Sequence, residues 1–118
     1  MSVTVEFREF VVEQFGRLVR GVKYRAMFGG VSIAGPEGTF ALIDDDVVYL
    51  KGDKVNRDHY DEAGWPAFRP FGTEGSAMSY FAVPGELLED VDALEPWIAL
   101  ALAAAARAPR KAKKGRRQ

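Results

Sequence analysis

Four short segments of β-type residues follow one another in the first half of the chain, with only a few residues between them. They cover residues 22–28, 31–34, 39–43 and 47–51. A connection between parallel strands needs about a dozen residues or more, whereas tight turns join antiparallel strands. The sequence therefore predicts an antiparallel meander here.

The joints between these segments differ in their residues. Residues 35–38, Gly-Pro-Glu-Gly, suit a tight turn, because proline presets the backbone at the second position and glycine tolerates the fourth. Three aspartates at 44–46 predict the next turn. Residues 27–30 are unusual, because two adjacent glycines weaken a strand. We expect a bulge, a bend, or a close approach of another part of the chain at these glycines.

Helices are predicted before and after this meander in the sequence. Residues 4–21 place apolar side chains at helical spacing, with a cap at Ser2 or Thr4 and a left-handed end at Gly21. A short helix at 54–63 follows the cap residue Asp53 and stops at Gly64. A fifth strand is predicted at residues 77–83.

The last helix is almost entirely apolar between residues 97 and 106. Its start stays open, because Asp92 begins a pattern like a capping box, whereas Pro96 favours a start at the proline itself. We expect it to end near residue 108. With no polar face, it is either buried within the fold or half buried against a partner molecule. The apolar run of ten residues is well short of the roughly 20 that cross a membrane.

Together these segments predict an α+β fold with an antiparallel sheet of four to five strands and N-terminal, middle and C-terminal helices. The length of 118 residues fits one domain, which we place at residues 1–108. The absence of cysteine fits a reducing compartment, and the cytoplasm is the expected location.

The net charge of −1 hides two opposite parts. Residues 1–106 hold nine of the sixteen basic residues and all seventeen acids, which leaves a charge of −8, and residues 107–117 add +7. We interpret residues 109–118 as a disordered basic tail, because the segment has almost no large apolar side chains to bury. Its cations are candidate contacts to nucleic acid: Arg110, Lys111, Lys113, Lys114, Arg116 and Arg117.

Motifs for catalysis or metal binding are weak. His59 is the one histidine, and without cysteine it does not make a typical zinc site. The aspartates at 44–46 do not fit a calcium loop, whose twelfth position would be Val55 rather than glutamate. No serine lies in a G-x-S-x-G context. We expect no catalytic residue, no metal ion and no cofactor.

An aromatic segment near residue 70 is a candidate partner surface. Most aromatic side chains between residues 65 and 81 are expected in the core, but Phe68, Arg69 and Phe71 lie in a loop-like stretch with two prolines. Aromatic residues and arginine are enriched in protein interfaces.

A family resemblance covers about residues 4–107. The stretch MFGGVSIAGPEGTFALIDDDVVYLK, followed in order by FRPF, MSYFAVP, LLED and PWIALALAAAARA, closely resembles the N-terminal domain of TfoX/Sxy-type bacterial competence regulators. The resemblance implies an antiparallel sheet with flanking helices, a link to transcriptional regulation of DNA uptake, and no catalytic residues. It also implies a structural motif at Met27, Phe28, Gly29 and Gly30, with Phe28 in the core and the glycines allowing the strand to bend.

The leading hypothesis is therefore a regulatory interaction module that binds a protein partner within a transcription complex. The alternative is a direct, largely non-specific nucleic-acid-binding protein that uses the tail. A third hypothesis is an enzyme or ligand-binding domain built on the glycine bend. The sequence leaves open whether the protein is a monomer or a homodimer.

Overall fold

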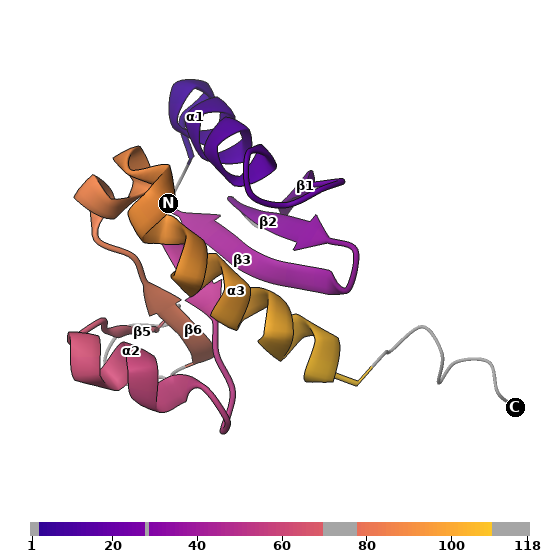
Figure 1. The fold of residues 1–118 in the computed structure, drawn as a ribbon. Helices are drawn as coiled ribbons and strands as arrows, with labels where there is room; N and C mark the ends of the chain where they lie inside the picture. The colour runs from indigo at the N-terminus through magenta and orange to yellow at the C-terminus, as the bar shows by residue number, and fades with distance from the viewer. Residues whose placement is uncertain (1–2, 28, 70–77, 110–118) are drawn as a thin grey trace, which may run out of the picture.

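The computed structural model describes residues 3–27, 29–69 and 78–109. This part of the chain forms three α-helices, a short 3₁₀ helix and one six-stranded antiparallel sheet (Figure 1). The elements are α1 (Val5–Gly16), β1 (Lys23–Met27), β2 (Gly30–Gly35), β3 (Gly38–Asp44), β4 (Val47–Lys51), α2 (Arg57–Ala63), β5 (Ala67–Phe68), β6 (Met78–Ala82), η1 (Gly85–Glu89) and α3 (Val91–Arg107). The predicted α+β class is confirmed.

The sheet has one more strand than the upper limit of the prediction. Its order is β1-β2-β3-β4-β6-β5, so the first four strands form the predicted meander and β6 pairs with β4. The additional strand is β5, a pair of residues that lies against β6 at one edge. Two residues are too few to give a periodic pattern, which is why the sequence did not reveal this strand.

Gly29 lies in the turn of the β1–β2 hairpin, and Gly30 is the first residue of β2. Met27 pairs with Gly30, and Gly29 between them has a left-handed φ of 82°. A Cβ on Gly30 would lie 2.7 Å from the carbonyl oxygen of Ile43 on β3. The expected close approach of the same chain is confirmed, whereas a bulge is wrong at this place. Phe28, which was predicted to lie in the core, falls outside the described residues.

One face of the sheet forms the floor of the core. Side chains that alternate along the central strands are buried there, among them Ile33, Ile43, Val48 and Leu50. Helix α3 packs across β3 and β4 on this face (Figure 1). Helix α1 adds Phe15, whose ring centroid lies 5.6 Å from that of Phe40.

Helix α1 begins as predicted and ends earlier. The N–H of Phe7 donates to Oγ1 of Thr4, so Thr4 is the cap. The helix ends at Gly16, and Gly21 lies beyond it in a turn with φ of 75°. Gly21 is left-handed as expected but does not end the helix, because residues 17–21 already form turns.

Helix α3 begins five residues before the proline. Its cap is Asp90, whose side chain accepts the N–H of Ala93, and Pro96 lies inside the helix. The start at Pro96 is therefore wrong, and the capping residue lies two positions before Asp92. One side of α3 is buried through Leu94, Ile98 and small residues, and exposed alanines cover much of the other side.

An aromatic cluster joins α2 and α3 to the sheet. The ring of Tyr60 stacks on Phe81 with centroids 4.8 Å apart, and on Trp97 at 5.8 Å. Trp65 completes the cluster at 4.2 Å from Trp97. The hydroxyl of Tyr60 donates a hydrogen bond to the carbonyl oxygen of Lys51 over 2.9 Å. The expectation that most of these rings belong to the core is confirmed for Trp65 and Phe81.

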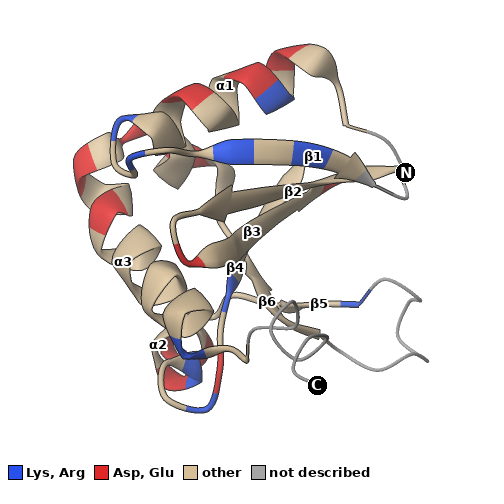
Figure 2. Cartoon of the chain, turned by 90° about the vertical axis from the view of Figure 1, so that its right-hand side faces the viewer, with Lys and Arg blue, Asp and Glu red and all other residues tan. Residues whose placement is uncertain are grey.

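Strand β1 is the more open edge of the sheet. Residues 23–26 are all exposed, so both faces of this strand contact solvent. Figure 2 shows its basic residues, Lys23 and Arg25, along the strand.

Candidate interaction site

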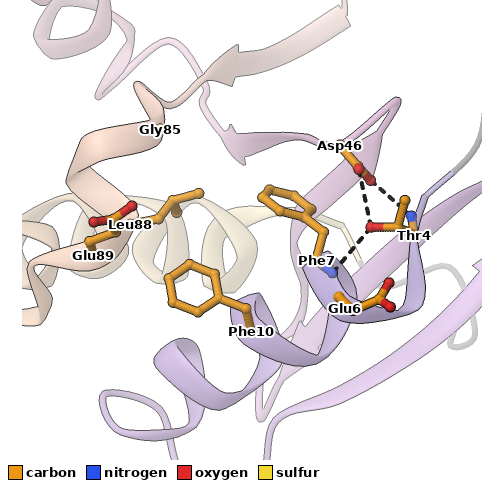
Figure 3. A pocket seen from close by; sticks show the side chains of 8 residues that line it. All are labelled: Thr4, Glu6, Phe7, Phe10, Asp46, Gly85, Leu88 and Glu89. Carbon is orange, nitrogen blue, oxygen red and sulfur yellow. Dashed lines mark hydrogen bonds between the residues drawn. The ribbon is translucent and has the colours of Figure 1, made fainter.

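A groove of about 560 Å³ runs between the first helix and the short 3₁₀ helix, η1 (Figure 3). Segments far apart in the sequence meet there: the start of α1, the β3–β4 turn and η1. Its lining consists of Thr4, Glu6, Phe7, Phe10, Asp46, Gly85, Leu88 and Glu89.

The apolar part of the groove comes from three side chains. Leu88 is only 2% exposed and belongs to the core, whereas Phe10 is 36% exposed. Phe7, one turn earlier on α1, is partly buried. Figure 3 shows both phenylalanine rings projecting from α1 toward Leu88. The groove thus extends the core to a surface where an aromatic ring contacts water.

A buried hydrogen bond fixes the distance between the two walls. The side chain of Gln14 is 8% exposed, and its Nε2 donates to the carbonyl oxygen of Leu88 over 2.8 Å. Its Oε1 accepts from Nε of Arg17 at 3.2 Å. Because its nitrogen and its oxygen both have partners, the Gln14 amide holds α1 against η1 without being left unpaired itself.

The β3–β4 turn supplies an acidic residue that anchors the start of α1. Asp45 and Asp46 have φ values of 55° and 58°, which is typical of a two-residue hairpin turn. The Asp46 carboxylate accepts the N–H of Thr4 at 2.9 Å and its hydroxyl at 3.1 Å. This contact orders the residue that caps α1.

Two further carboxylates line the groove, Glu6 on α1 and Glu89 on η1 (Figure 3). Both are exposed, and neither has an ion-pair partner within the described part of the chain. An apolar floor between three acidic side chains favours a ligand with a hydrophobic group and positive charge. It disfavours phosphate groups.

The predicted partner surface at residues 68–71 falls on a different part of the molecule. Phe68 lies on β5, and its ring centroid is 4.4 Å from that of Tyr49. Phe68 is therefore half-buried on the sheet face opposite Leu50. Arg69 is exposed, and Phe71 lies outside the described residues.

The predicted nucleic-acid contacts, residues 110–117, also lie outside the described residues. The preceding cation of the same run, Arg107, ends α3 and donates to Asp53 through Nε at 2.7 Å and through Nη2 at 2.9 Å. This arginine is thus part of an internal contact. His59 lies exposed on α2.

Groups with a shifted pKa serve internal contacts. Burial raises the pKa of Tyr60, whose hydroxyl already bonds to the backbone, and burial also raises the pKa of Tyr80. The hydrogen bond from Arg107 lowers the pKa of Asp53. Within residues 3–27, 29–69 and 78–109, no three acidic or histidine side chains gather to hold a metal ion. Nor does any helix of these ranges have the length and apolarity that crossing a membrane requires.

Helical spacing in the sequence identifies the apolar residues of α1 but does not show which of them stay exposed in the groove. Phe7 and Phe10 lie at the helical spacing of apolar side chains predicted for residues 4–21, and such a face usually packs on the core. The rest of the molecule covers Val11 and Phe15 completely but leaves Phe10 open. Tertiary packing, which the helical pattern does not encode, separates the covered positions from the open one.

The TfoX N-terminal domain model matches residues 13–105. The chain belongs to the TfoX N-terminal domain family. Membership identifies it, at a coarse level, as a regulatory, competence-related module. The segment matched to the TfoX N-terminal domain begins after Phe10, so part of the groove precedes it. No curated protein sequence shows a significant match.

Proposed function

We propose that this TfoX N-terminal domain is a non-enzymatic interaction module that acts in transcriptional regulation by binding a protein partner. The observation that carries the proposal is the family match over residues 13–105, combined with a groove whose floor leaves Phe10 open to water. Partly exposed aromatic side chains in a well-packed setting are typical of protein interfaces.

The titratable groups agree with a binding role. Tyr60, with a raised pKa, and Asp53, with a lowered one, lie in internal contacts of α2 and α3 and do not converge on the groove. A catalytic site usually brings such groups together in one cleft. This distribution supports binding rather than chemistry.

Affinity purification of the tagged domain from the cells that produce it tests the proposal. We expect a protein to be retained at a stoichiometric level and to co-elute with the domain in size-exclusion chromatography. A second form that ends at Pro109 should retain the same protein, because the folded part makes the contact. A domain that elutes alone in both forms, even after chemical cross-linking, would contradict the proposal.

Nucleic-acid binding through the tail is the second candidate, and the charge of residues 110–117 favours it. Six cations lie there without an acid, and Arg107 is already bound to Asp53. If the tail binds duplex DNA, log affinity should fall with log salt at a slope of about −0.9 per neutralised phosphate. The form that ends at Pro109 should lose this dependence. Absence of binding at low salt would exclude this candidate.

A further inference from the structure

We propose that the groove between α1 and η1 binds a segment of a partner protein in which one large apolar side chain is flanked by lysine or arginine. This inference rests on the proposed function and assigns its binding surface and the chemistry of its partner. The occupant is a peptide segment of another protein rather than a nucleic acid or the tail of this chain.

The apolar contact is provided by Phe7, Phe10 and Leu88. Leu88 is already buried, so the surface to be gained lies on the two phenylalanine rings, and Phe10 has the larger exposed fraction. A large aliphatic or aromatic side chain placed between the rings would remove apolar surface from water and so favour binding. Gln14 fixes α1 against η1, so the groove exists before the partner arrives.

The charge of the groove selects what flanks that side chain. Glu6, Asp46 and Glu89 come from three different elements and surround the apolar floor (Figure 3). Among the described residues, no cation pairs with Glu6 or Glu89, so both are available to lysine or arginine. Glu9 and Glu13 on the exposed side of α1 add little to this charge, because Arg8 lies 3.8 Å from Glu9 and Arg17 lies 3.2 Å from Glu13. A basic partner is therefore attracted, and a phosphate backbone is repelled.

The tail of this chain has only half of the required chemistry. Residues 110–118 contain six cations but no apolar side chain larger than alanine. The tail can satisfy the acidic side chains and cannot fill the space between Phe7 and Phe10. The tail of a second copy is therefore a weaker occupant than a segment with a large apolar group.

Peptide binding measured by fluorescence anisotropy tests this assignment. The probe is a labelled peptide of about twelve residues with one central tryptophan, six flanking lysines and arginines, and glycine and serine elsewhere. The comparison peptides replace the tryptophan by alanine, replace all cations by glutamate, or reproduce residues 107–118 of this chain. We expect saturable binding of the tryptophan peptide, and dissociation constants larger by about tenfold for the alanine peptide and for Phe10→Ala.

The charged groups are tested with a second variant that preserves the apolar floor. The double variant Glu6→Gln, Glu89→Gln should bind the tryptophan peptide about threefold more weakly, or weaker still, at low salt. Its binding should also depend less on salt. Val55→Ala and Glu62→Gln are matched controls, because Val55 is 68% exposed and both residues lie far from the groove in sequence and outside its lining. Both should bind as the wild type does.

Several outcomes would overturn the inference. One is equal affinity of the wild type for the glutamate peptide and the tryptophan peptide. Another is an equal loss of affinity in Val55→Ala and Phe10→Ala. A third is binding of the peptide from residues 107–118 as tightly as the tryptophan peptide, which would make the tail the occupant. Equal retention of the cellular partner by the wild type and the groove variants would also overturn it while leaving the proposed function intact. Failure of the wild type to retain any partner bears on the proposed function instead.

Discussion

Arg107, the last residue of α3, donates two hydrogen bonds to the carboxylate of Asp53, which lies in the loop before α2. Nε contacts Oδ2 at 2.7 Å, and Nη2 contacts Oδ1 at 2.9 Å. The same carboxylate accepts the backbone N–H groups of Val55 and Asn56. One side chain therefore connects the end of α3 to the start of α2.

This pair predicts an acid-dependent contribution to stability. The hydrogen bond from Arg107 lowers the pKa of Asp53 below its ordinary value of 3.8. A lowered pKa in the folded state stabilises the fold above that ordinary value, and the contribution is lost as the pH falls through the folded-state pKa. We expect Arg107→Gln to reduce stability at pH 7 and to differ less from the wild type below about pH 3.

Urea denaturation at both pH values measures this difference. Arg57→Gln is the control, because its contact with Asp61 spans 3.7 Å between two exposed side chains. A constant difference between Arg107→Gln and the wild type at both pH values would argue against the assignment.

Tyr60 predicts the opposite dependence at high pH. Its hydroxyl donates to the carbonyl oxygen of Lys51, so Tyr60→Phe should cost about 0.5–1.5 kcal/mol at pH 7. Burial raises the pKa of Tyr60 above its ordinary value of 10.0, so the stability from the protonated hydroxyl is complete below pH 10 and is lost as the pH rises above it. The difference between Tyr60→Phe and the wild type should therefore shrink between pH 8 and pH 11 in denaturant titrations. Tyr24→Phe, at an exposed ring, serves as the comparison, and a difference that stays fixed for Tyr60→Phe would refute the prediction.

Gly30 predicts a steric effect at the β1–β2 hairpin. The Cβ of Gly30→Ala would lie 2.7 Å from a backbone oxygen of β3, so the strands would have to shift. Overpacking of this kind costs about 1–3 kcal/mol. Gly16→Ala is the matched control, because a Cβ there meets no atom within 4 Å and the residue lies in α1. Thermal unfolding should show a lower Tm for Gly30→Ala and an equal or higher one for Gly16→Ala, and the reverse order would contradict the close approach.

Pro96 predicts a stabilising substitution. It is exposed inside α3 and has no N–H to donate to the carbonyl of Asp92, four residues earlier. Proline costs about 3 kcal/mol relative to alanine in a helix interior, although it also restricts the unfolded chain by about 0.4–1 kcal/mol. We expect Pro96→Ala to gain about 2–2.6 kcal/mol in the free energy of unfolding, the difference of these effects. A loss of stability would show that the proline is needed for the path of α3.

The sequence predicted the sheet because its turns are local. The proline and glycines at 35–38 and the aspartates at 44–46 set the strand connections through their own backbone preferences, and Gly64 ended α2 in the same way. The pattern missed the start of α3, which a local cap sets, and β5, which tertiary packing sets. Asp90 started α3 early enough to include a proline, and β5 formed because β6 was already present to pair with it.

The helical spacing of apolar residues did not predict the groove, for a related reason. Helical spacing identifies which residues of α1 share a face, but it does not say how far the neighbouring element covers that face. Phe10 differs from Phe15 only in what lies opposite it, and η1 reaches that position through a contact 74 residues apart in sequence, from Gln14 to Leu88. The family resemblance predicted the fold and was confirmed over residues 13–105.

The exposed edge at β1 has a consequence for how copies of this protein behave when concentrated. An open strand offers unpaired backbone groups to any other strand, and a flat apolar edge would nucleate ribbons of stacked molecules. Lys23 and Arg25 are exposed residues of that strand, so two antiparallel copies paired there would bring like charges together. We therefore expect the charges of β1 to disfavour edge-to-edge pairing of two copies.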